Sequence, residues 1–175
     1  MKKVIMTLLV ISGLCFTQTG MVSEGGMGVW LNANAMGIGD MEDADAQYAL
    51  SFDYVMGMGL ELGVDYWLDD AMDGQMDLGV MYHMGGEGMS WAFGLKMTDF
   101  SEEHGDMGTV LSGGGYTEGL MHFGLDYDTD ADDDEMTVSF GKLFAMDAMT
   151  FGVGYRANTS MMGDGWLTLS VGSAF

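Results

Sequence analysis

Eight titratable side chains recur in stretches of this 175-residue sequence where large apolar residues alternate with small or polar ones. They stand between the apolar residues and are Asp53, Glu61, Asp65, Asp77, Lys96, His122, Asp126 and Arg156. Five acids accompany only two bases, so a space that encloses these side chains needs ion pairs and water to balance its charge. Two roles are open: a salt-bridge network that stiffens an interior, or the charged lining of a narrow cation-preferring pore.

A second group of acids lies in one segment, 128–135. Asp128, Asp130, Asp132 and Asp134 alternate along it. Hard cations such as Ca²⁺ and Mg²⁺ take several carboxylate oxygens, so these four residues are the candidate metal ligands. The segment lacks the glycine and the distant glutamate of a calcium loop, and a solvated acidic surface is the alternative. No cofactor is expected other than Ca²⁺ or Mg²⁺ at such acidic loops.

Candidate catalytic residues are few. His104 and Asp106 could form a hydrolytic pair opposite the acids at 69–70. Ser101 lies near His104, which would suit an acyl hydrolase. However, no nucleophile, base and orienting group stand at a fixed spacing. We therefore expect that the protein is not an enzyme.

The elements that carry these residues are expected to be strands, because apolar residues recur at every second position. Rising and falling segments alternate with a repeat of about 30 residues. The rising segments span Met27–Met36, Leu60–Leu68, Met89–Phe100, Leu120–Asp128 and Met149–Ala157. The falling segments span Ala46–Met56, Gly74–Met84, Asp106–Tyr116, Asp134–Phe144 and Gly165–Phe175. The segment 106–116 is the weakest of them, because GTVLSGGGY carries little apolar surface.

One side of nearly every expected strand is bulky and apolar, whereas the other side is polar or rich in glycine. A soluble barrel would have to pack the bulky side inward, where it would overfill a small interior. Strands of about 9–11 residues can cross hydrocarbon at a tilt, and a closed sheet leaves no backbone group unpaired there. The sequence therefore predicts an all-β fold, a transmembrane up-and-down antiparallel β-barrel of about ten strands, with eight as the alternative.

Large side chains have expected places in this barrel. One rim would carry an aromatic girdle of Tyr54, Tyr82, Tyr116, Phe144 and Phe175. The other rim would carry Tyr66, Tyr127, Tyr155 and Trp166. The eight titratable residues would line the lumen, where glycines favour free space. The bulky residues expected to reduce that space are Trp30, Trp67, Met81, Leu111 and Leu143.

The N-terminus reads as a secretory signal. Lys2 and Lys3 precede an apolar stretch, and cleavage after Thr19 would leave residues 20–175 as the barrel with acidic extracellular loops. Removal of residues 1–19 would leave three of the five Lys and Arg residues against 27 Asp and Glu. So negative a chain cannot neutralise phosphates, which excludes nucleic acid as a partner.

The leader, the alternating strands and a last strand LTLSVGSAF that ends in an aromatic residue resemble small bacterial outer-membrane β-barrel proteins of the porin-like and opacity types. The resemblance covers nearly the whole chain after the leader. It implies location in a bacterial outer membrane, with membrane lipid and lipopolysaccharide as partners. It also implies recognition by the barrel-assembly machinery through Leu167, Leu169, Val171 and Phe175. Ser173 departs from the bulky residue that is usual at its position.

Two functions fit this pattern. The first is a narrow passive channel for small or cationic solutes, with the eight titratable residues in its lining. The second is a non-conducting structural or adhesin-type surface barrel, whose acidic loops bind cations or partners. The sequence indicates neither the solute nor an oligomeric state.

Overall fold

The structure is a computed structural model, and it describes residues 25–68, 74–86, 89–99, 107–130, 136–161 and 163–175. The expected leader, residues 1–19, lies outside this part of the chain. Within it, no helix is long and apolar enough to cross a membrane.

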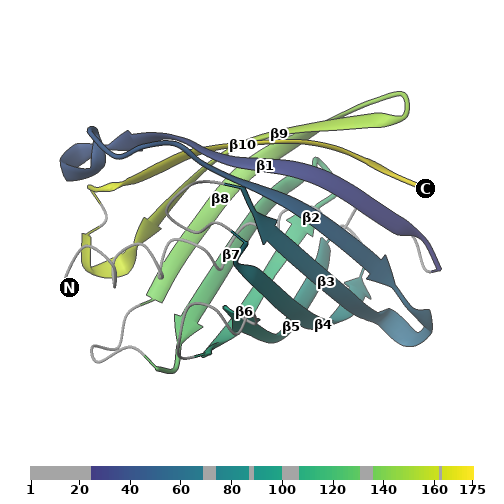
Figure 1. Cartoon of the computed structure of the whole chain (residues 1–175). Helices are drawn as coiled ribbons and strands as arrows, with labels where there is room; N and C mark the ends of the chain where they lie inside the picture. Colours follow the sequence, from purple (N-terminus) through teal and green to yellow (C-terminus); the bar gives the residue numbers. More distant parts are fainter. Residues whose placement is uncertain (1–24, 69–73, 87–88, 100–106, 131–135, 162) are drawn as a thin grey trace.

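The chain forms a closed, antiparallel, up-and-down β-barrel (Figure 1). Its strands are β1 (Met27–Ile38), β2 (Gln47–Val55), β3 (Leu60–Trp67), β4 (Met76–Gly86), β5 (Met89–Thr98), β6 (Gly108–Thr117), β7 (Met121–Asp128), β8 (Met136–Met146), β9 (Met149–Asn158) and β10 (Gly165–Ala174). Each strand pairs with its neighbours in sequence, and β1 pairs with β10. The expected all-β fold, an up-and-down antiparallel barrel, and the preferred count of ten strands are thereby confirmed.

Short 3₁₀ turns mark the two ends of the barrel. The turn η4 (Gly57–Gly59) joins β2 to β3. The turns η3 (Gly39–Met41) and η5 (Thr159–Met161) follow β1 and β9 and lie at the opposite end. The C-terminal residue Phe175 exchanges two backbone hydrogen bonds with Met27, of 2.7 and 2.8 Å, at the η4 end. Both ends of the described chain therefore lie at one end of the barrel.

The weakest expected strand is nevertheless part of the sheet. β6 pairs with β5 from Gly108 to Thr117 and with β7 from Val110 to Tyr116. Its limited apolar surface does not prevent pairing, because the two neighbouring strands satisfy its backbone groups on both edges.

The inward and outward sides of β6 are the reverse of those expected. Tyr116 is buried on the lumen side and Leu111 is exposed on the outer side, so Leu111 does not narrow the lumen. A shift of one residue moves a whole strand to the opposite face. Trp166 is likewise buried rather than part of a rim girdle, because it is one residue out of phase with the outward-facing Leu167 and Leu169.

Large apolar side chains cover the outside of the barrel. Every strand contributes at least one that is more than a third exposed, including Leu31, Phe52, Leu62, Val80, Phe93, Leu111, Leu125, Phe140, Val153 and Leu169. We call these residues the outer apolar belt. The inside, in contrast, buries asparagine, aspartate, lysine and arginine together with Trp30, Trp67 and Leu143.

Candidate functional site: the polar lumen

All eight titratable residues that were expected to line the lumen are buried inside the barrel, each 5% exposed or less. They come from six of the ten strands, β2, β3, β4, β5, β7 and β9. Because the strands are antiparallel and in register, side chains on neighbouring strands meet directly or on a diagonal. Their closest contacts fall into three groups, and one histidine, His122, belongs to none of them.

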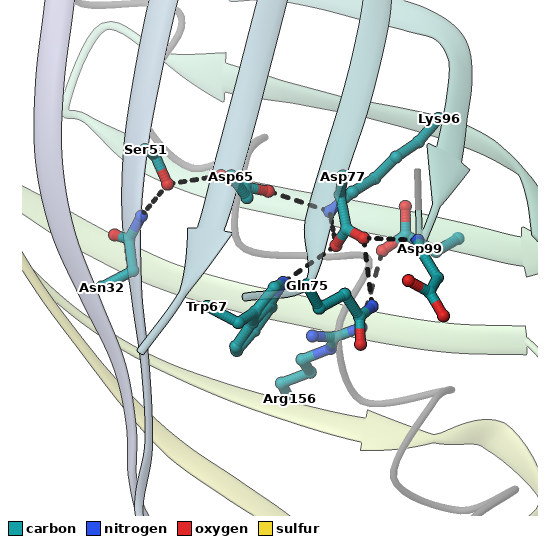
Figure 2. Close-up of polar contacts among 10 residues, drawn as sticks. Asn32, Ser51, Asp65, Trp67, Gln75, Asp77, Lys96, Asp99 and Arg156 are labelled. Atoms are coloured by element: carbon teal, nitrogen blue, oxygen red, sulfur yellow. Dashed lines mark hydrogen bonds and ion pairs between the residues drawn. The ribbon is translucent and has the colours of Figure 1, made fainter. Parts of the chain in front are cut away.

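The first group centres on the ammonium of Lys96, on β5. Its Nζ lies 2.9 Å from Asp65 Oδ2 and 3.4 Å from Asp77 Oδ2 (Figure 2). Asp65 and Asp77 are direct register partners on β3 and β4, so their carboxylates lie side by side. One cation between two carboxylates stabilises both of them in a space that water does not reach.

Neutral side chains extend this group from β1 to β5 (Figure 2). Asn32 Nδ2 donates to Ser51 Oγ over 2.7 Å, and the Ser51 hydroxyl donates to Asp65 Oδ1. Trp67 Nε1 donates to Asp77 Oδ2 over 3.0 Å. The other acceptor, Asp77 Oδ1, receives Gln75 Nε2 over 3.1 Å and the Asp99 backbone N–H over 3.0 Å. We call this set the Lys96 network.

Several members of the Lys96 network were not predicted from the sequence. Asn32, Ser51 and Gln75 are uncharged, so their residue types carry no sign of a charged network. Only the position of a residue along its strand could have indicated a place in the lumen. Asn32, for example, lies two residues from Trp30 on β1 and so faces the same side. Asn34, two residues farther along, likewise donates to Gln47 Oε1 over 2.9 Å.

The second group is an ion pair. Arg156 on β9 approaches Asp126 on β7, with Nη2 and Oδ2 3.9 Å apart. The intervening strand β8 places Thr137 beside Asp126 and Ser139 beside Arg156. This pair is looser than the Lys96 network.

The third group lies toward the η4 end. Glu61 Oε2 and His83 Nε2 are 2.7 Å apart, and the His83 side chain is 17% exposed. Asp53 lies on the inward face of β2, near both Glu61 and Asp65. His122 belongs to none of the groups: its ring packs near Tyr116, with centroids 6.1 Å apart.

Large side chains fill the space next to several glycines of the lumen. A Cβ added at Gly172 would collide with the Trp30 ring, and one at Gly152 would approach Leu143 Cδ2 at 2.9 Å. At Gly94, an added Cβ would meet Met81 Sδ at 2.6 Å. These glycines therefore make room for neighbouring side chains rather than for solvent.

Two of the expected metal ligands, Asp128 and Asp130, lie at the η3 end. Asp130 Oδ2 accepts the Thr109 N–H over 2.6 Å, and Asp128 Oδ1 accepts the Asp130 N–H over 2.9 Å. Asp132 and Asp134 lie outside the described residues, as do Ser101, His104 and the acids at 69–70 and 106. Among the residues that are described, no three of the types His, Cys, Asp and Glu are arranged to hold a metal ion.

The expected insertion signal lies on the last strand. Leu169 faces outward and is 45% exposed, and Leu167 and Val171 share its phase. Phe175 is 71% exposed at the C-terminus. The apolar face of β10 is thus continuous with the outer apolar belt.

The chain was compared with known protein families and with curated proteins, and neither a family model nor a curated protein matches it.

Proposed function

We propose that the protein is an integral β-barrel of a bacterial outer membrane. The outer apolar belt is the observation that carries this proposal. Monomeric soluble proteins rarely expose contiguous apolar patches of more than a few hundred Å². Here leucine, valine, methionine and aromatic side chains face outward on all ten strands. Hydrocarbon is the environment in which such a surface is stable.

The distribution of polar residues supports the same proposal. Within the strands, the charged residue on the outer face is Lys142, whose Nζ lies 5.5 Å from the centroid of the Phe144 ring near the end of β8. A lysine so close to a strand end can extend its ammonium toward water. The remaining charged residues of the described strands point inward or lie at strand ends.

For the lumen, we propose a closed state and a structural or surface-interaction role. Trp30, Asn32, Asp65, Trp67 and Asp77 are each at most 1% exposed. A water-filled pore alongside strands β1 to β4 would expose these side chains. The buried hydrogen bonds and ion pairs of the Lys96 network therefore support a stiff, packed barrel that displays its acidic loops.

A narrow channel is the second candidate, favoured by one observation. On β7 and β8 the inward positions include Gly124 and Ser139, which are only partly buried, unlike the inward residues of β1 and β2. A passage for small cations would run along this side of the lumen. It would pass the Asp126–Arg156 pair.

The membrane proposal is tested by purifying the full chain from bacterial membranes. We expect it to remain with the membrane after carbonate washing, and to migrate faster on detergent gels before boiling than after it. A chain that is monodisperse in buffer without detergent would overturn the proposal. A peripheral protein, released by carbonate, would overturn it as well.

The lumen is tested separately by planar-bilayer recording of the refolded protein. The closed state predicts no steady single-channel conductance at neutral pH. Stable cation-selective conductance that falls on the change Asp126→Asn would instead support the channel. As a control, Asp147→Asn alters an exposed turn residue between β8 and β9 and should leave either result unchanged.

A further inference from the structure

One lysine interrupts the apolar surface on the outside of the barrel. Lys142 is exposed on β8 and lies between Phe140 and Phe144 on the outward side of that strand. Its register partners are Met121 on β7 and Val153 on β9, which are 45% and 40% exposed. The ammonium is therefore surrounded by the outer apolar belt, where a charge without a partner is unfavourable.

Lys142 lies at the η4 end of this belt. Met121 is the first residue of β7, so β7 does not continue past Lys142 toward the η4 end. The turn before β7 lies at the same level, because the Leu143 N–H donates to the Leu120 carbonyl oxygen over 2.9 Å. Lys142 Nζ lies 5.5 Å from the centroid of the Phe144 ring, which is two residues nearer the β8–β9 turn. The side chain thus extends away from the centre of the belt, toward the level at which lipid headgroups would begin.

Among its described residues, the barrel supplies no counter-charge to this ammonium. No carboxylate of that part of the chain forms an ion pair with Lys142. Two acids of this rim, Glu118 and Asp147, are exposed in the β6–β7 and β8–β9 turns. An ammonium at the border of hydrocarbon is stabilised by an ionic partner, and a lipid phosphate is an anion found at that level.

We propose that Lys142 and the apolar residues beside it bind one anionic phospholipid, such as phosphatidylglycerol. The phosphate pairs with the ammonium, and the acyl chains lie along Met121 and Val153 and continue over the outer apolar belt. A headgroup with a net negative charge fits better than a zwitterionic one, because the zwitterion carries its own cation. This inference rests on the proposed membrane location.

The opposite rim of the barrel would repel such a lipid. Asp128, Asp130 and Asp164 lie at the η3 end. The other lysine and the arginine of the described strands, Lys96 and Arg156, are each 1% exposed inside the lumen. Charge complementarity therefore restricts the lipid site to the outer face at the η4 end.

Native mass spectrometry of the refolded full chain tests this site. The barrel would be released from detergent micelles that contain equal amounts of phosphatidylglycerol and phosphatidylcholine, and the first lipid bound to it would be identified. The attraction of one ammonium to an anionic lipid corresponds to about five-fold in affinity, so we expect a ratio of phosphatidylglycerol to phosphatidylcholine of about five. The ratio should fall to about one in Lys142→Met and stay at about five in Lys142→Arg.

Asp147→Asn is the control for net charge, because Asp147 is exposed in a turn at the same rim. A local site leaves the ratio of this variant unchanged. If the ratio rises in Asp147→Asn as much as it falls in Lys142→Met, net charge attracts the lipid and the inference is wrong.

Two further results separate this inference from the membrane proposal. A wild-type barrel that binds both lipids equally overturns the inference, but it leaves the membrane proposal intact. A chain that retains neither lipid also overturns the inference, and the carbonate wash then decides the membrane proposal independently.

Discussion

At the scale of single residues, Lys96 has the most demanding position in the barrel. Its side chain is 1% exposed, and its ammonium lies between two carboxylates that are fully buried. Taking three charges out of water costs free energy. The short contacts between Lys96 and the two carboxylates offset this cost, as do the hydrogen bonds that Asp65 and Asp77 accept. Removing the one cation therefore costs more than the direct contacts suggest, since both carboxylates then lack a counter-charge.

We predict that Lys96→Met destabilises the folded barrel by about 3–5 kcal/mol. The measurement is the free energy of unfolding in urea, in detergent or lipid vesicles. Lys142→Met is the matched control, because Lys142 is exposed on the outer face and its ammonium lies over the Phe144 ring. Its loss should cost less than about 1 kcal/mol. Equal effects of the two changes would contradict a buried Lys96 network.

At the scale of elements, β6 shows how a weak strand is retained. Gly115 lies between Trp91 on β5 and Phe123 on β7, as its register partner on each side. The two rings meet edge to face, with centroids 5.2 Å apart, and Phe123 lies over the glycine. The neighbouring strands thus supply the apolar contact that the sequence of β6 lacks.

The outer side of these strands gives a test of the membrane at the element scale. Leu95, on β5, is 49% exposed, and Met146, at the end of β8, is 63% exposed. In water both positions would tolerate arginine. In a bilayer we predict that Leu95→Arg costs about 2–4 kcal/mol and Met146→Arg about 0–1, because the penalty depends on depth.

Urea unfolding in lipid vesicles, followed by the gel shift, measures both variants. The difference between them is the informative quantity, since both changes replace an exposed apolar residue with the same charge. If both variants lost a similar, small amount of unfolding free energy, β5 would not be surrounded by hydrocarbon, and the membrane proposal would be contradicted.

At the scale of the whole molecule, closure depends on the contact between the first and last strands. β1 and β10 pair from Gly28 with Ala174 to Ile38 with Gly165, and the register shifts between Asn34 and Met36. An extra residue on one strand bends it and increases its twist, which suits the seam of a closing barrel. The seam leaves neither of these two strands with a free edge.

We predict that cysteines at Val29 and Ser173, which are register partners across this seam, form a disulfide on mild oxidation. Paired residues of antiparallel strands have Cα separations that a disulfide can span. Boiled, unreduced samples should then migrate differently from reduced ones. The control pair Val29→Cys and Val171→Cys is two residues out of register and should cross-link poorly. Both variants would carry Cys15→Ser, and efficient cross-linking of the control pair would contradict the register.

The sequence by itself determined the strands and, for nine of the ten, which side faces out. Side chains alternate across a strand, so a period of two is a local property that needs no partner. The same reasoning placed all eight titratable residues inside the barrel. The alternation did not predict the sides of β6, because its glycines and small residues distinguish neither side. Which residues of β6 face the lumen then depends on where the neighbouring turn begins.

Only the tertiary structure decided which charges meet. Lys96 binds Asp65 and Asp77 rather than Asp53, although all three acids have the same inward phase. Their pairing depends on the register between strands and on the slant of the sheet, which turn lengths and closure through β1 and β10 set together. Asp53 lies between its register partners Gly28 on β1 and Gly63 on β3 for the same reason. Ion pairing is a property of the closed sheet, whereas sidedness is a property of each strand.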